Sequence, residues 1–207
     1  MNDKFLIKSA CGTCGLSGAN VTHCFNEQCV TADGIERGVM SINRKIPGPS
    51  IHVCQGDLIL VDVMNMMAGT SEAIHWHGFH QKKTPYMDGV PFITQCPIDF
   101  STTFRYSFYA TETGTQFYHS HAGHHKANGI HGGIVVRQNL KNDLSSKFYD
   151  QDLKEHLIVA SDWMRDYAEM LMPGLRSHPT GIQPTNILIN GKGIVYNVRL
   201  ALALNFN

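Results

Sequence analysis

Short apolar segments, each broken by turn residues, follow one another along most of the chain after Gly38. The segments are rich in Val, Ile, Phe and Tyr, residue types that suit a pleated strand. Turn residues separate them at fairly regular spacing, which favours an antiparallel β-sandwich. We therefore predict an all-β chain with strands at 39–42, 50–54, 58–64, 73–80, 103–108, 116–121 and 133–137.

The chain of 207 residues is long enough for one complete core and part of a second. Residues 1–35 are rich in Cys, Gly and Asn and predict an irregular lead-in, and residues 36–138 hold the strands of a first domain. A polar linker at 139–154 precedes a strand at 156–161, a short helix from Ser161 or Asp162 to Pro173, and a strand at 186–191. Since these elements are too few to close a second sandwich, we expect residues 155–207 to be its incomplete start.

The charges of the chain balance, with 17 Lys and Arg residues against 17 Asp and Glu residues and no basic run. This balance argues against nucleic acid or an anionic membrane as the main partner. No apolar stretch approaches the roughly 18 residues that a membrane-spanning helix needs.

Four cysteines crowd into the first thirty residues: Cys11, Cys14, Cys24 and Cys29. They could hold a tetrahedral zinc ion, or they could form disulfides in an oxidising compartment, and we favour disulfides. The glycosylation sequon at Asn20 also favours a secreted protein. The first ten residues lack a hydrophobic signal segment, so we expect that this start is not the natural precursor start.

Two His-X-His pairs are the most informative chemical feature of the sequence. His75 and His77 flank Trp76, and His119 and His121 stand two residues apart in the same way. Residues i and i+2 of a strand point to the same face, so each pair presents two imidazoles on one side. If the two strands are neighbours, we expect four imidazoles to converge on one patch.

Imidazole binds copper, zinc, nickel and iron, so the residue type alone does not name the metal. One such pair can arise by chance, or its rings can be ordinary core or surface groups. Two pairs inside long motifs favour a metal site, and two metal ions a few ångströms apart would use both pairs fully.

Long motifs surround both pairs. The sequences IHWHGFHQ (74–81), PYMDGVP (85–91), TQCPI (94–98) and GTQFYHSH (114–121) resemble the first cupredoxin domain of multicopper oxidases. The sequences NRKIPGPS (43–50) and VCQGD (53–57), and the Cys-rich lead-in with ADGIERG (32–38), resemble the arthropod laccase branch. The resemblance runs from about Cys11 to Gly193.

The resemblance implies three cupredoxin (plastocyanin-like) domains, each a Greek-key β-sandwich, of which the chain holds the first and the start of the second. It implies that His75 binds the type 2 copper, His77 and His119 one type 3 copper, and His121 the other. A type 1 copper would oxidise a phenol or a similar substrate, and the cluster would reduce O2 to water. Asp88 resembles an acidic residue that aids proton delivery there, and its plain alternative is a turn residue.

The resemblance is incomplete in ways that affect function. No His-Cys-His segment and no cysteine follow Cys96, so this chain alone cannot build a type 1 site of the family kind. A third domain would be needed to complete the copper cluster. We expect the chain to contribute half of the trinuclear ligands of a laccase-like oxidoreductase. The alternative is a copper-binding but catalytically silent fragment or isoform.

Smaller departures lie near the second pair. His125 stands where the family usually has Gln, and Asn128 where it usually has Asp, a change expected to alter the electrostatics of the cluster. His80, His124, His125 and His131 could support the metal ligands or line an entry path, but exposed loop positions are the default expectation.

Two cysteines lie outside the lead-in. Cys96 resembles a family cysteine that can bridge to the third domain, and here it is either unpaired or bonded to Cys54. The sequence does not decide between these two states.

Overall fold

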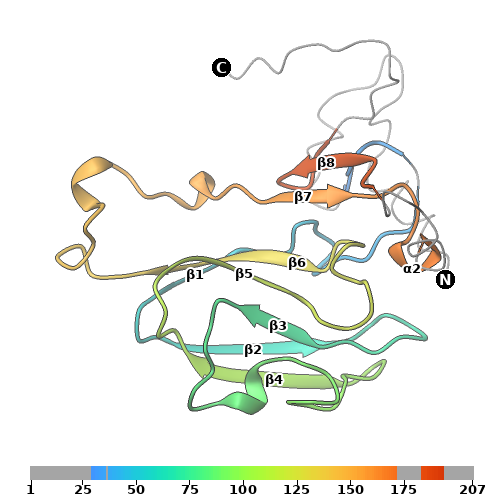
Figure 1. Ribbon diagram of the computed structural model, residues 1–207, viewed down its shortest axis with the longest axis horizontal. Helices are drawn as coiled ribbons and strands as arrows, with labels where there is room; N and C mark the ends of the chain where they lie inside the picture. Colours follow the sequence, from blue (N-terminus) through green and yellow to red (C-terminus); the bar gives the residue numbers. More distant parts are fainter. Residues whose placement is uncertain (1–28, 36, 172–182, 194–207) are drawn as a thin grey trace, which may run out of the picture.

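The computed structural model describes residues 29–35, 37–171 and 183–193, and these residues form eight strands and a few short helical turns (Figure 1). None of the described helices is long and apolar enough to cross a membrane. The strands are β1 Ile51–Cys54, β2 Leu58–Met64, β3 Ile74–His77, β4 Thr103–Tyr109, β5 Gly114–Ser120, β6 His131–Arg137, β7 Ala160–Trp163 and β8 Asn186–Ile189. The helical turns are η2 Pro85–Met87, η3 Ser146–Phe148, η4 Lys154–His156 and α2 Ala168–Leu171.

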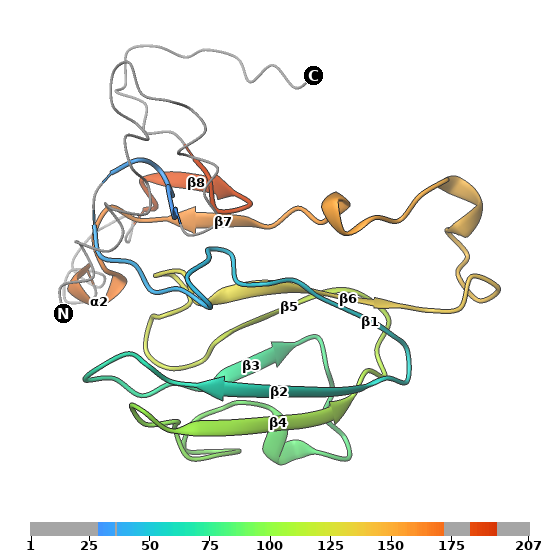
Figure 2. The same ribbon diagram turned by 180° about the vertical axis from the view of Figure 1, so that it is seen from behind.

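Six of the strands form the two sheets of a sandwich. One sheet has the order β1-β6-β5-β3, and the other is the antiparallel pair β2-β4 (Figures 1 and 2). The all-β prediction is therefore confirmed. The purely antiparallel arrangement is wrong at one place, because β1 pairs with β6 in parallel, Ile51 opposite Ile134. A parallel pair needs a long crossover, and here the chain visits the other sheet between these two strands.

The core of the sandwich is aromatic and lies between the sheets. Trp76 is 1% exposed, and its ring centroid lies 5.2 Å from that of Tyr106 and 5.1 Å from that of Phe108. Tyr118 lies opposite Trp76 in the register and packs on it at 5.8 Å. Edge-on and tilted aromatic contacts of this kind add to the burial of apolar area. The cluster also contains Ile59, Ile74, Phe79, Ile98, Ala110, Ile130, Ile134 and Val136.

Alternation along β3 connects this core to the opposite face of the sheet. Trp76 points into the core, so the side chains of His75 and His77 must point away from it, because neighbouring strand residues face opposite sides. The same argument applies to β5, where Tyr118 is in the core and His119 is not. Packing of the two aromatic residues therefore fixes the direction of the histidines.

The segment 39–42, predicted as a strand, is not one. Ile42 makes only an isolated bridge to Lys45, around a tight turn in which Asn43 and Arg44 both have positive φ. The Met40 N–H instead donates to the Asn128 carbonyl at 3.1 Å. The backbone here forms a turn and a loop contact in place of a strand ladder. The side chains of Met40 and Ile42 still pack against the core.

The helix predicted from Ser161 or Asp162 begins later than expected. Strand β7 runs through Trp163, and Asp162 pairs with Ile187 of β8, so these residues are already committed to a strand ladder. The helix that follows is the single turn Ala168–Leu171, and its expected end at Pro173 lies outside the described residues. Pairing with a distant strand has overridden a local capping signal.

The β7–β8 pair lies on the far side of the first sheet from β2–β4 (Figures 1 and 2). Trp163 and Leu188 form a small cluster with Ala32 and Ile46, and the Gly193 N–H donates to the Ala32 carbonyl at 2.8 Å. The described end of the lead-in, at Ala32, therefore packs against the segment that follows the linker. The domain limits 1–35, 36–138, 139–154 and 155–207 stay a prediction.

Truncating the central tryptophan should weaken the sandwich strongly. Trp76→Ala removes a buried aromatic side chain, and we expect it to lower the free energy of unfolding by about 3–5 kcal/mol. Leu60→Ala is the control, because Leu60 on β2 is 56% exposed and should cost less than about 1 kcal/mol. Urea unfolding followed by far-UV circular dichroism measures both. Equal losses would contradict the assignment of Trp76 to the core.

Candidate metal centre

Pairing of β3 with β5 brings the two His-X-His pairs together. In the register His75 lies directly opposite His119, and their ring centroids are 5.4 Å apart. His77 is 5.7 Å from His119, and His121, just beyond β5, is 5.5 Å from His75. The His121 N–H donates to the Ala73 carbonyl at 2.8 Å, which extends the ladder by one residue. The four imidazoles therefore converge as the sequence predicts.

Backbone carbonyls fix the orientation of two of these rings. The Nδ1–H of His75 donates to the Asp88 carbonyl at 2.7 Å, and that of His119 donates to the Ser120 carbonyl at 2.8 Å. A carbonyl accepts only, so the proton of each neutral ring must lie on Nδ1. The Nε2 atoms are then free to donate a lone pair to a metal ion.

The protonation of His119 suits metal binding. Burial lowers the pKa of His119 to about 4; the hydrogen bond to Ser120 opposes this shift, and the nearby Lys126, His75 and His77 add to it. The ring is therefore neutral at pH 7, as a metal ligand must be.

The donor set fits copper. One ligand atom from each of His75, His77 and His119 lies within 4.8 Å of the others. His77 stacks on Phe117 at 4.6 Å between centroids, so its ring also has a fixed plane. Imidazole is a good ligand for copper, and the clustering of these rings brings several ring nitrogens to one small volume. His77 and His121 are exposed, so further ligands can approach from that side.

Asp88 lies beside the first pair. Its carbonyl accepts the hydrogen bond from His75, and its carboxylate Oδ1 is 3.5 Å from the same nitrogen. The next residue, Gly89, has a positive φ of 82°, and a Cβ there would overlap the Ile74 carbonyl. The loop of Asp88 thus approaches β3 as closely as it does because residue 89 is glycine.

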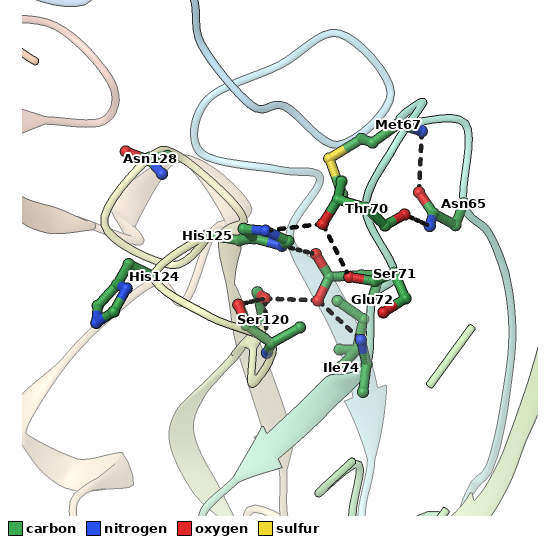
Figure 3. A network of polar contacts seen from close by, with 12 residues as sticks. Asn65, Met67, Thr70, Ser71, Glu72, Ile74, Ser120, His124, His125 and Asn128 are labelled. Carbon is green, nitrogen blue, oxygen red and sulfur yellow. Dashed lines mark hydrogen bonds and ion pairs between the residues drawn. The ribbon is translucent and has the colours of Figure 1, made fainter. Parts of the chain in front are cut away.

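Behind the second pair lies a buried polar network that the sequence analysis did not identify (Figure 3). Glu72, 3% exposed, accepts hydrogen bonds from the Ser120 hydroxyl at 2.5 Å and from the Ala73 N–H at 2.8 Å. Its other oxygen is 3.0 Å from Nδ1 of His125, whose Nε2 is 3.2 Å from the Thr70 hydroxyl. A lone Glu at the start of a strand carries no sequence signal, so only the fold could show this network.

Two of the other histidines are not exposed loop residues. His125 is 6% exposed, and its hydrogen bond to Glu72 raises its pKa above the usual range. His131 lies on β6 opposite His119, and burial lowers its pKa. For these two residues the default expectation is wrong, because the chain folds back over them after the second pair. His80 is exposed as expected and pairs with Glu112, while His124 is half-buried.

The side chain of Asn128 contacts helix α2, and the expectation that it alters the electrostatics of the histidine cluster stays a prediction. Its amide Nδ2 donates to the Glu169 carboxylate at 2.6 Å, and its Oδ1 accepts from the Ala168 N–H at 3.1 Å. Asn128 is 1% exposed and joins the loop after the second pair to helix α2. An amide serves both contacts, because its NH2 group donates and its oxygen accepts.

The cysteines follow two patterns. Cys54 and Cys96 are both free and exposed, so they are not bonded to each other. Cys29 is disulfide-bonded. The remaining cysteines of the lead-in lie outside the described residues, so the choice between zinc and disulfides for that group stays a prediction.

Comparison with known families agrees with this geometry. A family model described as multicopper oxidase matches residues 24–141. Among similar proteins, an L-ascorbate oxidase of Cucumis sativus is 37% identical over 164 residues, which cover 78% of this chain and 27% of that protein. Laccase-1 of Cryptococcus neoformans var. grubii is 37% identical over 168 residues, covering 78% and 26%. The chain thus spans only about a quarter of the length of these relatives.

Solved structures show the same fold. The multicopper oxidase Fet3p, which functions in iron import, aligns with a TM-score of 0.67 at 32% identity over 78% of this chain and 30% of that one. The laccase from Botrytis aclada aligns with a TM-score of 0.68 at 33% identity, covering 78% and 29%. The cupredoxin-like Greek-key sandwich predicted from the sequence is confirmed.

A side chain at residue 89 should disturb the first pair. Gly89→Ala forces the Asp88 loop away from the Ile74 carbonyl, so we expect a loss of about 2–4 kcal/mol in the free energy of unfolding and a changed chemical shift of the His75 ring. Gly56→Ala is the matched control, since Gly56 also has a positive φ but nothing lies near its added Cβ. If the two variants behave alike, backbone strain rather than the close approach explains the effect.

The stability of the metal-free chain should fall with acid because of His119. The unfolded ring takes up a proton below about pH 6.5, whereas the folded ring resists protonation until pH about 4. Folding is therefore penalised progressively as the pH falls from 6.5 to 4, by up to about 3 kcal/mol. His119→Gln should show a smaller loss over this window in urea unfolding. The same pH dependence in both proteins would contradict the buried neutral ring.

Proposed function

The chain belongs to the multicopper oxidase family, and we propose that it supplies half of the trinuclear copper ligands of a laccase-like oxidoreductase. This enzyme would oxidise phenolic or similar substrates and reduce O2 to water. The observation that carries the proposal is the convergence of four imidazoles where β3 meets β5. Two strands locked into one register by a buried aromatic core hold these rings.

By resemblance, we assign His75 to the type 2 copper. We assign His77 and His119 to one type 3 copper, and His121 to the other. The closeness of ligand atoms from the first three residues supports a shared site. Bound copper would supply one-electron redox chemistry and a place for O2 to react. The chain's own part is to present imidazoles whose rings are held by hydrogen bonds and to leave the side near His77 and His121 open.

Asp88 is proposed to help deliver protons at the type 2 position. Its carboxylate is 3.5 Å from His75 and only partly buried, so it can exchange protons with solvent next to the metal site. Its carbonyl has a separate role, since it holds the His75 ring with Nε2 directed toward the cluster. A change of the side chain alone would therefore test proton delivery without losing the ring orientation.

A second candidate function is copper binding without turnover. By resemblance, half of the trinuclear ligands and every type 1 ligand would come from a third domain. With two imidazoles per ion, water would fill the other positions, and affinity would be modest. The exposure of His77 and His121 favours this alternative for the isolated chain.

The finer identity of the protein also stays a proposal. The motifs NRKIPGPS and ADGIERG resemble the arthropod laccase branch, and this resemblance supports the proposal that the chain belongs to it. The sequon and the early cysteines support secretion into an oxidising compartment. Relatives include both laccases and L-ascorbate oxidases, so phenols and ascorbate are the first substrates to test in the full-length enzyme.

Copper stoichiometry tests the shared site. We expect His77→Ala and His119→Ala each to lower the copper bound per 207-residue chain, because each removes one ligand of the same ion. His80→Ala should leave the stoichiometry unchanged, since this exposed ring pairs with Glu112 outside the cluster. Elemental analysis after equilibrium dialysis gives the counts. Wild-type stoichiometry in both of the first two variants would overturn the proposal.

The visible spectrum separates the two candidate functions. Without a type 1 site, the copper-loaded chain should lack an intense blue thiolate band and should consume no O2 with a phenol. A strong blue band would contradict the proposed division of ligands. O2 uptake by the isolated chain, abolished in His119→Ala, would show that the chain alone turns over.

A further inference from the structure

We propose that Glu72 is a positioning residue for the copper ligands of both His-X-His pairs and that His125 holds it in place. The inference rests on the proposed function, since it assumes that these histidines bind copper. Glu72 is buried and contacts Ser120 (Figure 3), whose side chain points away from the face of His119 because neighbouring strand residues face opposite sides.

A single carboxylate oxygen of Glu72 reaches both strands. It accepts from the hydroxyl of Ser120, the residue between His119 and His121. It also accepts from the N–H of Ala73, just before β3. The Ala73 carbonyl in turn accepts the His121 N–H at 2.8 Å. Each of these contacts fixes backbone within two residues of a ligand.

Hydrogen bonds hold both the side chain and the carbonyl of Ser120. Its hydroxyl donates to Glu72 and accepts from the Ala122 N–H at 3.1 Å, so the side chain is held from two directions. Its carbonyl orients the His119 ring. A shift of Ser120 would therefore move the ring of one ligand and the backbone of the next, and the copper geometry with them.

His125 provides the hydrogen-bonding partner for the second oxygen of this buried carboxylate. An ionised carboxylate without a partner is very costly to bury, and His125 lies 3.0 Å from its second oxygen with an exposure of only 6%. The far nitrogen of His125 contacts the Thr70 hydroxyl at 3.2 Å, which fixes the ring. The other acidic group that acts on His125 is Glu169.

The backbone of Glu72 is held independently of its side chain. Its N–H donates to the Ile98 carbonyl at 2.9 Å, and its carbonyl accepts from the Ile98 N–H at 2.7 Å. A change of the carboxylate to an amide leaves this bridge intact. The consequences should therefore appear at the copper ligands more than in the fold.

The test compares Glu72→Gln with Glu112→Gln in the 207-residue chain. Both replace the carboxylate of a Glu–His pair, but Glu112 pairs with the exposed His80, whereas Glu72 also accepts from Ser120 between two of the ligands. Copper(II) is titrated against a chelator, and the spin Hamiltonian parameters of the bound ion are read by electron paramagnetic resonance. We expect Glu72→Gln to weaken copper binding about 10-fold and to shift the hyperfine coupling, and Glu112→Gln to do neither.

Two further measurements distinguish a loss of copper affinity from a loss of folded protein. Ser120→Ala removes one of the two Glu72 contacts next to the ligands and keeps the ion pair, so an intermediate loss of affinity with a shifted hyperfine coupling is expected. Urea unfolding of each copper-free variant gives its folded fraction. If affinity falls only in proportion to that fraction, with unchanged spectra, Glu72 is merely structural.

The outcomes also separate this inference from the proposed function. Unchanged affinity and spectra in both Glu72→Gln and Ser120→Ala, with copper stoichiometry still lowered in His77→Ala and His119→Ala, would overturn the role of Glu72 alone. Wild-type copper stoichiometry in both His77→Ala and His119→Ala would overturn the proposed function first.

Discussion

The candidate metal centre depends on the packing of Trp76 between the two sheets. Alternation along β3 allows one side chain to enter the core only if its two neighbours face the other way. Burial of Trp76 against Tyr106 and Phe108 therefore determines the direction of both histidines of the first pair. A slip of one residue in the register would bury the imidazoles and expose the indole, at a cost the core would not tolerate.

Hydrogen bonds around the histidines set their ring orientations, in addition to the direction that the core gives them. Backbone carbonyls orient His75 and His119, and the buried pair of Glu72 and His125 braces the ends of both strands from behind. Glu72 is also a link between elements distant in the sequence, because its partner Ser120 lies 48 residues away. The two faces of this part of the sheet thus carry different groups. The four imidazoles converge on one face, and the buried Glu72–His125 hydrogen-bond network lies behind the other.

Much of this could be predicted from the sequence, because strand periodicity and the two His-X-His pairs are local signals. The convergence of His75 and His119 followed from period-2 alternation and one assumption about pairing. The burial of His125 was not predictable, since its partner Glu72 is brought to it only by the fold. The late start of α2 was missed for a similar reason, because the residues expected to cap it, Ser161 and Asp162, pair with β8. Non-local pairing decided each of these cases.

The state of the histidine nitrogens tests the central claim most directly. Long-range ¹H–¹⁵N nuclear magnetic resonance on the metal-free chain should show His75 and His119 with a proton on Nδ1, as their carbonyl contacts require. Adding diamagnetic copper(I) should then shift ring nitrogens of the four converging histidines and leave those of His52, which lies on β1, unchanged. Protons on Nε2 in the metal-free chain, or copper shifts confined to other histidines, would contradict the account.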